Sequence, residues 1–232
     1  MRIAMLMLTF NRLEFTKIVL ENYFKTTKVA HDLLIWDNHS TDGSRKWLDQ
    51  VAKKQWKMKV HLCKQNIGVP DAIRGFFRHP ICHGKDLVGK IDNDVLVCEN
   101  WLENFVKAFE KVHQLGVVAA YNKVNPPKKV KDFNGIPLSP SMHGMQGSLW
   151  LARSSTIRKY PFVEEGYAGN WNYFGRLGSK HKVLLAYHRK VYFLTDRRQW
   201  GGSNPFPNFN YDAYYNQIAK YRSYRHPGFL PK

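Results

Sequence analysis

The sequence predicts an α/β fold: an open, mostly parallel, twisted sheet with helices on both faces, in a single domain. Short apolar segments that are typical of buried strands alternate with segments of helical periodicity through the first half of the chain. This alternation is the pattern of repeated β-α-β units, whose strands run parallel. The length of 232 residues and the hydrophobic content of 44% suit one packed domain and exclude a disordered chain.

The expected strands are continuous apolar runs. In chain order they cover residues 3–8, 33–36, 59–62, 87–91, 117–120 and 148–152. The expected helices have apolar residues at intervals of three and four. They cover residues 12–25, a segment around 47–51, 70–78 and 101–112. Ser40, Thr41 and Asp42 are helix-capping residues before the second helix, and Pro70 suits the first turn of the third.

The second half of the chain is less regular. Residues 122–145 are rich in Pro, Lys and Gly and predict a long loop, and residues 184–194 predict a β-hairpin that turns near His188 and Arg189. We expect one domain over residues 1–196, followed by a basic, aromatic-rich extension over 197–232. No internal repeat indicates a second domain.

The cysteine and hydropathy patterns exclude several protein classes. Cys63, Cys82 and Cys98 are odd in number and lack C-x-x-C spacing, so neither a disulfide framework nor a zinc site is expected, and the predicted location is cytoplasmic. No stretch approaches the roughly 20 apolar residues of a membrane span, so no integral membrane segment is expected. The opening "MRIAMLMLTFNR" predicts a strand rather than a signal peptide, because its apolar run is short and no small-residue cleavage site follows.

The net charge is unusually positive. Lys and Arg number 36 against 18 Asp and Glu, which leaves a formal charge of +18. Such a field favours a polyanionic partner, which could be nucleic acid, an anionic membrane or a phosphate-bearing substrate. The alternative is that the charge serves only solubility.

Polar side chains follow four of the predicted strands where each strand ends. They are Asn11, Asp37, Asn66 and Asp92. In an open parallel sheet the carboxyl ends of the strands meet at one edge, and ligands bind there. We therefore place the functional site at this edge.

The segment "GKIDNDVLV" (89–97) interrupts an apolar run with two carboxylates, Asp92 and Asp94. Carboxylates are rarely buried unless they are paired or bind a metal. Two carboxylates two residues apart at a strand end offer the oxygen ligands that Mg²⁺ or Mn²⁺ prefers, and such metals typically bridge to substrate phosphates. Alone, this D-x-D arrangement is a weak signal, since Asp-x-Asp turns are common.

Four motifs in order make the signal specific. They are "LTFNR" (8–12), "IWDNHSTDGS" (35–44), "NIGVPDAIRGF" (66–76) and "KIDNDV" (90–95). Here the sequence resembles the GT-A fold glycosyltransferases, and among them the inverting family 2, with its opening strand, its "DNxSTDGS" signature, its N-x-G-x₅-R segment and its D-x-D pair. "GSLWLARSS" (147–155) is similar to the family's acceptor-side strand and extends the resemblance to about residue 195.

The resemblance implies a nucleotide-sugar donor half over residues 1–95 and an acceptor half over 96–196. The residues that it implies at the donor are Thr9, Asn11, Arg12, Asp37, Asn66, Gly68, Arg74, Asp92, Asn93, Arg197 and Arg198. Asp37 is expected to bind the base or ribose of a UDP-sugar. Asp92, Asp94 and Asp196 are expected to hold Mn²⁺ or Mg²⁺, with Asp94 the more direct ligand.

Several of these residues also have a purely structural explanation. Asp37 suits a turn or a helix cap, Asn11 an Asx turn and Gly68 a tight turn, while Arg74 suits an exposed helix surface. Their convergence at neighbouring strand ends favours the functional interpretation.

The sequence departs from the family where the general base is expected. Relatives usually have Glu-Asp before the helix that follows the acceptor strand, and this chain has Gly169-Asn170. Asparagine cannot accept a proton, so Glu164 and Glu165 are the nearest candidates for the base. The alternatives are that this acidic pair is a solvated loop, or that the reaction retains configuration without such a base.

A second departure lies at "VYFLTD" (191–196), where many relatives have a histidine and this chain has Phe193. Asp196 and His188 are the candidates to replace it. Arg197 and Arg198 follow, and paired guanidiniums suit a diphosphate leaving group, although an exposed basic linker is an equal alternative.

The acceptor is predicted from composition alone. The net charge, the lysines at 123, 128, 129 and 131, and the tail "YDAYYNQIAKYRSYRH" (211–226) combine basic residues with aromatic ones. This combination favours nucleic acid, because Lys and Arg side chains neutralise phosphates and aromatic side chains stack on unpaired nucleobases. In composition the chain is similar to bacteriophage glycosyltransferases that modify hydroxymethylated pyrimidines in DNA, which implies the host cytoplasm as the location.

Two other functions remain open. A transferase that builds surface polysaccharide or lipopolysaccharide would direct its basic patches to anionic lipid. A non-enzymatic nucleic-acid-binding module is the second, and the acids of the D-x-D and Asp37 segments argue against it. The oligomeric state is not predicted.

Overall fold

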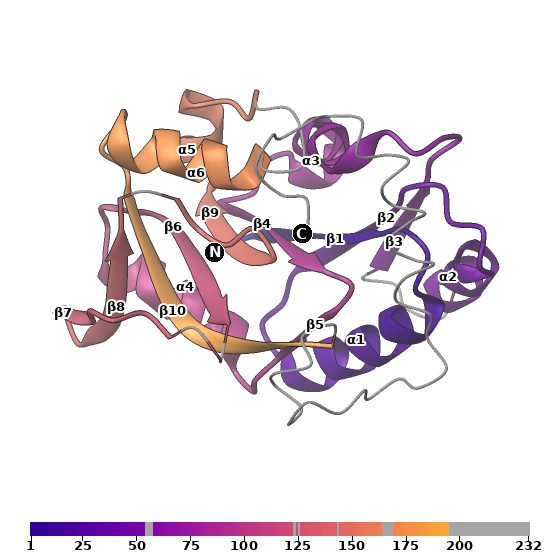
Figure 1. Cartoon of the computed structure of the whole chain (residues 1–232), viewed down its shortest axis with the longest axis horizontal. Coiled ribbons are helices and arrows are strands. Elements are labelled where there is room, and N and C mark those ends of the chain that lie inside the picture. Colours follow the sequence, from indigo (N-terminus) through magenta and orange to yellow (C-terminus); the bar gives the residue numbers. More distant parts are fainter. Residues whose placement is uncertain (54–57, 123, 125, 143, 164–168, 195–232) are drawn as a thin grey trace, which may run out of the picture.

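The computed structural model describes residues 1–53, 58–122, 124, 126–142, 144–163 and 169–194. Its described strands form one mixed sheet with helices on both faces (Figure 1). The strand order is β3-β2-β1-β4-β9-β6-β10-β8-β7, and β5 pairs with β10 off this path. The predicted α/β class and the open sheet are confirmed.

The first half of the chain contains the parallel part of the sheet. Its elements are β1 (Ile3–Thr9), α1 (Leu13–Thr26), β2 (Asp32–Asp37), α2 (Ser44–Ala52), β3 (Met58–Leu62), α3 (Gly68–Arg78), the short 3₁₀ helix η1 (Pro80–Cys82) and β4 (Leu87–Asp92). Strand β1 pairs in parallel with β2 and β4, and β2 with β3. Every residue of β1 is buried, as its unbroken apolar sequence predicts for a central parallel strand.

The second half adds antiparallel strands. Its elements are β5 (Val95–Val97), α4 (Trp101–Lys111), β6 (Leu115–Asn122), β7 (Lys131–Phe133), β8 (Ile136–Ser141), β9 (Leu149–Arg153), α5 (Ser154–Lys159), α6 (Gly169–Ser179) and β10 (Leu184–Phe193). Strand β9 lies antiparallel between β4 and β6, so it joins the two halves of the sheet.

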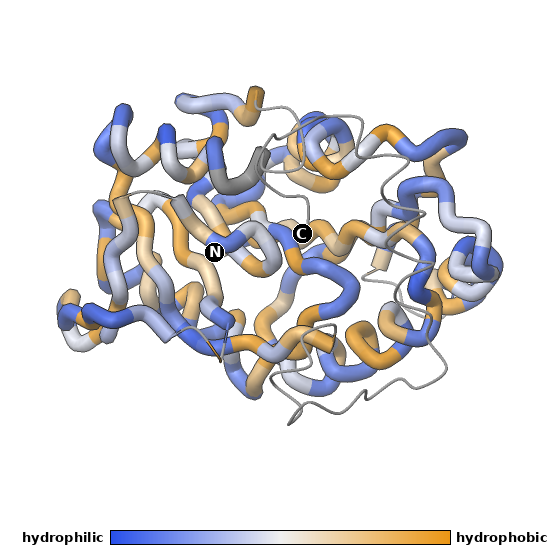
Figure 2. Tube along the Cα trace, in the orientation of Figure 1, coloured by the Kyte–Doolittle hydropathy of each residue, from blue (hydrophilic) through white to orange (hydrophobic). Residues whose placement is uncertain are grey.

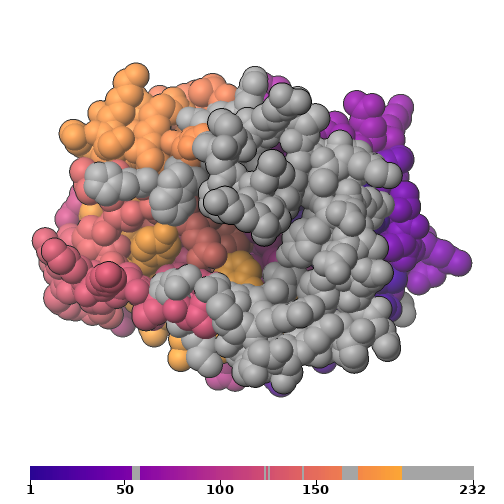
Figure 3. Space-filling model, in the orientation of Figure 1, coloured from indigo at the N-terminus to yellow at the C-terminus, as the bar shows by residue number. Residues whose placement is uncertain are grey.

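The expectation of a long loop over residues 122–145 is wrong in part. Strands β7 and β8 form an antiparallel hairpin that turns at Asn134 and Gly135. Both turn residues have positive φ, 55° and 79°, which Asn and Gly tolerate and which a two-residue hairpin turn of type I′ requires. Figure 3 shows this hairpin and the α2–β3 side at opposite ends of the molecule, as the strand order requires.

The expected hairpin over residues 184–194 is also wrong. The segment is one strand, β10, parallel to β6 and antiparallel to β8 and β5. The polar pair that suggested a turn instead marks an irregularity: Arg189 has a φ of 79°, and the register with β6 shifts between Tyr187 and Lys190. A bulge of this kind bends a strand without reversing it.

Two hydrophobic layers cover the sheet. One contains buried side chains of α1, α2 and α4, and the other those of α3, α5 and α6. In Figure 2 hydrophobic colour follows the central strands, and hydrophilic colour follows the connecting loops. No helix among the described residues has both the length and the apolar character that crossing a bilayer requires.

Candidate active site

The site lies where β1, β2 and β4 end. Thr9 is in register with Asp37 across the β1–β2 pair, and Leu8 with Asp92 across the β1–β4 pair. The sheet therefore brings the ends of three strands together at one edge, as the sequence predicted. Most of the hydrogen-bonding side chains at this edge belong to the last residues of these strands or to the loops that follow them.

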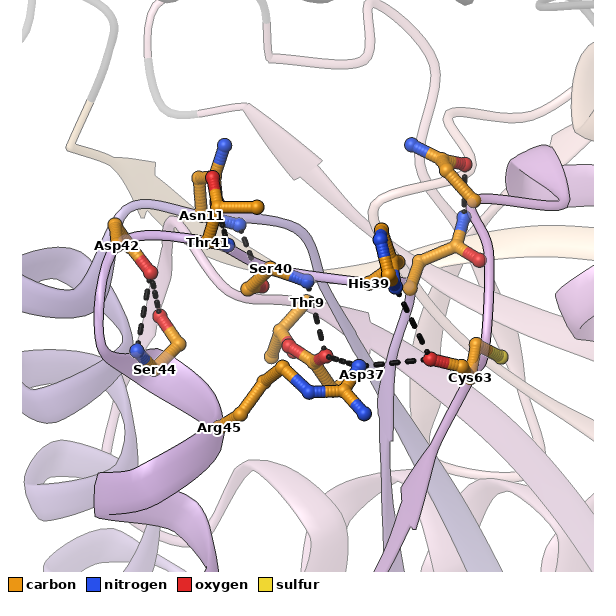
Figure 4. A network of polar contacts seen from close by, with 12 residues as sticks. Thr9, Asn11, Asp37, His39, Ser40, Thr41, Asp42, Ser44, Arg45 and Cys63 are labelled. Carbon is orange, nitrogen blue, oxygen red and sulfur yellow. Dashed lines mark hydrogen bonds and ion pairs between the residues drawn. The ribbon is translucent and has the colours of Figure 1, made fainter.

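Asp37 is the centre of this network and is fully buried. One carboxylate oxygen accepts hydrogen bonds from the Ser40 backbone N–H at 3.0 Å and from Arg45 Nη1 at 3.2 Å (Figure 4). The other oxygen accepts from Thr9 Oγ1 at 3.3 Å. Arg45 Nη1 also donates to the Cys63 carbonyl at 2.7 Å, so Asp37 ties the end of β2 to α2 and to the chain after β3.

The loops after β1 and β2 are hydrogen-bonded to each other. The Asn11 N–H donates to Ser40 Oγ at 2.7 Å, and the Thr41 N–H donates to Asn11 Oδ1 at 2.8 Å (Figure 4). Asp42 accepts from the N–H groups of Leu13 and Ser44, so it serves the first turns of α1 and α2 together. Of the expected capping residues, only Asp42 bonds the first turns of helices, whereas Ser40 and Thr41 bond Asn11, and the N-cap position of α2 is Gly43.

Asn66 and Gly68 join the same edge through a residue that the sequence analysis did not assign. The buried Asn38 donates from Nδ2 to Asn66 Oδ1 at 2.6 Å and accepts at Oδ1 from the Ile67 N–H at 3.0 Å. Gly68 has a φ of +77°, a conformation that side chains with a Cβ rarely adopt. The sequence did contain a signal for Asn38, because it is the second residue of the "DN" in the signature. In the structure Asn38 is buried, like Asp37.

The D-x-D acids are each paired with a basic side chain. Arg12 Nη1 donates to Asp94 Oδ2 at 2.8 Å, and Lys90 Nζ donates to Asp92 Oδ1. Asp94 is nearly buried, whereas the Asp92 side chain is 34% exposed. The part of the Asp92 carboxylate that is removed from water raises its pKa; Lys90 opposes this shift and Asp94 adds to it.

Asn93 turns away from the two acids. Its amide donates to Thr16 Oγ1 at 2.9 Å and to the Asn11 carbonyl at 3.4 Å, so it fixes the D-x-D turn against α1. Arg74 lies further along α3, where it pairs with Asp71 at 2.6 Å. It lines a separate pocket of about 490 Å³ that also includes Val88, at the beginning of β4 rather than at its end. A donor role for Arg74 stays a prediction.

The residues near the end of β10 are placed in part. Phe193, where relatives have histidine, pairs with Val95, and the Leu194 N–H donates to the Asp94 carbonyl at 2.9 Å. His188 is buried in mid-strand, and its Nδ1 is 2.9 Å from the Pro137 carbonyl. Glu164, Glu165, Asp196, Arg197 and Arg198 lie outside the described residues.

Comparison with known families agrees with this geometry. Residues 5–172 match the model of the family "Glycosyl transferase family 2". The chain belongs to glycosyl transferase family 2. The matched range runs from β1 into α6, so it includes both the loops after β1, β2 and β4 and the strand β9. No curated protein matches this family 2 chain.

Solved structures show the same fold at low sequence identity. The mannosyltransferase PcManGT from Pyrobaculum calidifontis, in complex with GDP-Man and Mn²⁺, has a TM-score of 0.65 and 16% identity over 83% of this chain. S. aureus TarS 1-349 with UDP-GlcNAc has a TM-score of 0.64 and 13% identity over 83%. GalNAc-T7 with UDP, GalNAc and Mn²⁺ has a TM-score of 0.66 and 11% identity over 83% of this chain. This family 2 chain covers 56%, 58% and 43% of those chains.

The carboxylates of Asp92 and Asp94 in this family 2 site are chemically suited to bind a divalent metal. Asp92 Oδ2 makes no hydrogen bond to any described residue, and carboxylate oxygens are the ligands that Mn²⁺ and Mg²⁺ prefer. Within the described part of the chain, no group of three or more His, Cys, Asp or Glu residues could hold a metal. Asp92 and Asp94 therefore offer a partial ligand set, which water and donor phosphates would complete.

Proposed function

We propose that this protein transfers a sugar from a nucleoside diphosphate sugar to a hydroxyl group, with a divalent metal. The observation that supports this most is the placement of Asp37 and the D-x-D acids at one sheet edge in a family 2 chain. Solved structures of similar fold contain GDP-Man, UDP-GlcNAc or UDP, two of them with Mn²⁺. UDP is the nucleotide that we propose for this chain.

The donor nucleotide is proposed to lie between the loops after β1 and β2. Asp37 is fully buried and its hydrogen bonds hold Thr9, Ser40 and Arg45, so it shapes the wall that the base or ribose contacts. Asn11 and Asn66 hold the flanking loops. A preorganised wall lowers the cost of ordering side chains when the nucleotide binds.

Asp92 and Asp94 are the proposed metal ligands, and Asp92 is the more accessible of the two. A bound Mn²⁺ or Mg²⁺ supplies positive charge that stabilises the departing nucleoside diphosphate. Asp196, Arg197 and Arg198 are proposed to assist at the diphosphate. Glu165 or Glu164 is proposed as the base that accepts the proton of the acceptor hydroxyl.

The acceptor that we propose is DNA with a hydroxymethylated pyrimidine. Lys128, Lys129 and Lys131 are exposed before and within β7, and the formal charge of +18 favours a phosphate backbone. Surface polysaccharide or lipopolysaccharide is the alternative acceptor, and a DNA acceptor would place the reaction in the cytoplasm.

The test is a transfer assay with several nucleotide sugars, Mn²⁺ and hydroxymethylated DNA, followed by mass analysis of the nucleosides. A nucleoside heavier by one sugar is expected with hydroxymethylated DNA and not with unmodified DNA of the same sequence. Asp94→Asn should give no product. Transfer only to a polysaccharide or lipid-linked acceptor would contradict the DNA acceptor. No transfer and no donor hydrolysis would favour the non-enzymatic module.

A further inference from the structure

Lys90 is a charged residue in an apolar layer of the protein. It is 1% exposed and sits in mid-strand on β4, in register with Leu6 on β1 and Trp150 on β9. Both neighbours belong to the hydrophobic layer on the α3, α5 and α6 side of the sheet. Lysine is almost never fully buried unless it is paired, because removing its charge from water is costly.

The ammonium group of Lys90 has two partners at the site. It donates to Asp92 Oδ1, and it donates to the Gly147 carbonyl at 2.9 Å. The Asp92 backbone N–H donates in turn to the Ser148 carbonyl at 2.8 Å. Lys90 therefore holds one oxygen of Asp92, while the other, Oδ2, makes no hydrogen bond to a described residue.

The three acids proposed for the donor and the metal are each paired with a basic side chain before any ligand binds. Within the described residues, Asp37 pairs with Arg45, Asp92 with Lys90 and Asp94 with Arg12. A free divalent cation at the D-x-D acids would thus meet two cations as well as two carboxylates. An anionic diphosphate, in contrast, would be attracted by Lys90 and Arg12.

We propose that Lys90 is a built-in cation of the donor site: it lowers the affinity of the Asp92–Asp94 pair for free divalent metal and offers its own charge to the donor diphosphate. The second half rests on the proposed function, because it requires a nucleoside diphosphate at this edge. Lys90 acts by holding Asp92 and through the electrostatic field of its ammonium group, so it is a positioning residue rather than a catalytic one.

The size of the effect follows from the distances. A metal bound about 2 Å from an Asp92 oxygen would lie on the order of 5 Å from the ammonium group. At that separation, the repulsion between a divalent and a single positive charge changes affinity by at least about tenfold, even with the dielectric constant of water. For a phosphate charge at a somewhat longer distance, the attraction changes affinity by about threefold or more.

The test measures metal and nucleotide binding separately at pH 7.5. Mn²⁺ binding without nucleotide is followed by electron paramagnetic resonance, and UDP and GDP binding in excess EDTA by calorimetry. The variants are Lys90→Met, which suits an apolar layer, and Lys90→Gln, which keeps a donor for the Gly147 carbonyl. In both we expect Mn²⁺ affinity to rise about tenfold and nucleotide affinity to fall at least threefold.

The opposite directions separate this role from structural damage, which would weaken both ligands. The matched control is Lys85→Met, since Lys85 is a half-buried lysine that is also paired with an aspartate, Asp32, but lies where β2 and β4 begin, at the edge away from the site. It should change neither affinity. Thermal unfolding of all variants identifies any that do not fold, and the second Lys90 variant then decides.

Three results would overturn the proposal. They are a fall of both affinities together in the folded Lys90 variants, no change in either, and no Mn²⁺ binding to any variant. If Mn²⁺ affinity rises but no variant binds UDP or GDP, the effect of Lys90 on the acids is upheld. The nucleotide donor, and with it the proposed function, then fails.

Discussion

Arg12 Nη1 lies 2.8 Å from Asp94 Oδ2, and this ion pair joins the loop after β1 to the turn after β4. Both side chains are nearly buried, at 10% and 13% exposure. Arg12 also has a positive φ of 61°, which orients its backbone at the beginning of α1. The pair therefore connects the two loops that, by our proposal, surround the donor diphosphate.

Removing one partner of this pair should destabilise the fold. Arg12→Leu leaves the Asp94 carboxylate nearly buried without its guanidinium, which we expect to cost about 3 kcal/mol in the free energy of unfolding. The double variant with Asp94→Asn should recover part of this loss. Urea unfolding of the wild type, both single variants and the double variant measures the coupling. Additive losses would contradict a direct interaction.

Asp37→Ala should weaken UDP binding by roughly tenfold to a hundredfold, because three hydrogen-bond donors lose a buried partner and the loop after β2 loses its shape. Calorimetry measures the affinity. Asp32→Ala, which removes the acid at the other end of β2, is the control and should leave it unchanged. Equal UDP affinity in the wild type and Asp37→Ala would show that the donor pocket lies elsewhere.

Asp92→Asn and Asp94→Asn should each abolish sugar transfer while the protein remains folded, and excess EDTA should inhibit the wild type. Asparagine keeps the shape of each side chain but loses the charge that binds a metal. Asp49→Asn, an exposed residue of α2 paired with Lys53, is the control and should retain activity. Full activity of the wild type in EDTA would reject the metal.

His188 should make the protein less stable in mild acid. Burial lowers the pKa of His188 below the usual histidine value of about 6.5, although its bond to the Pro137 carbonyl opposes this. The folded state therefore favours the neutral ring, and the unfolded state takes up the proton first as pH falls below about 6.5. Stability should decline between that pH and the lower folded pKa. Urea unfolding between pH 5 and 7 should show a smaller decline for His188→Gln.

DNA binding, if DNA is the acceptor, should depend steeply on salt, with a log–log slope of about −0.9 for each phosphate contact. Replacing the exposed Lys128, Lys129 and Lys131 with serine should make this slope less steep. The matched control replaces Lys46, Lys53 and Lys59, exposed at the other end of the sheet, with serine. Equal slopes in both triple variants would remove these lysines from the interface.

The C-terminal segment is tested by truncation after Asn210. This change should weaken DNA binding much more than UDP binding, because the donor loops precede residue 95. Equal losses for both ligands, or salt-independent DNA binding by the full chain, would favour the polysaccharide alternative.

Local patterns predicted most of the fold and the position of the site. The apolar runs placed β1 to β4, and the polar residues after them placed Asn11, Asp37, Asn66 and Asp92 at one edge. The Asn134-Gly135 turn was a readable hairpin signal that the Lys- and Pro-rich composition around it obscured. Long-range pairing was not readable: nothing local indicates that β9 lies between β4 and β6, or that Lys90 reaches Asp92 and Gly147.

The position of β9 has a consequence for the order of folding during synthesis. When residues 1–95 have left the ribosome, β4 lacks the strand that pairs with its outer side, and Lys90 lacks its carbonyl partner 57 residues downstream. An unpaired, apolar strand edge is prone to associate with other chains. The β4 edge closes only after β9, which ends at Arg153, has emerged, so its closure requires pairing between strands far apart in the sequence, which is intrinsically slow.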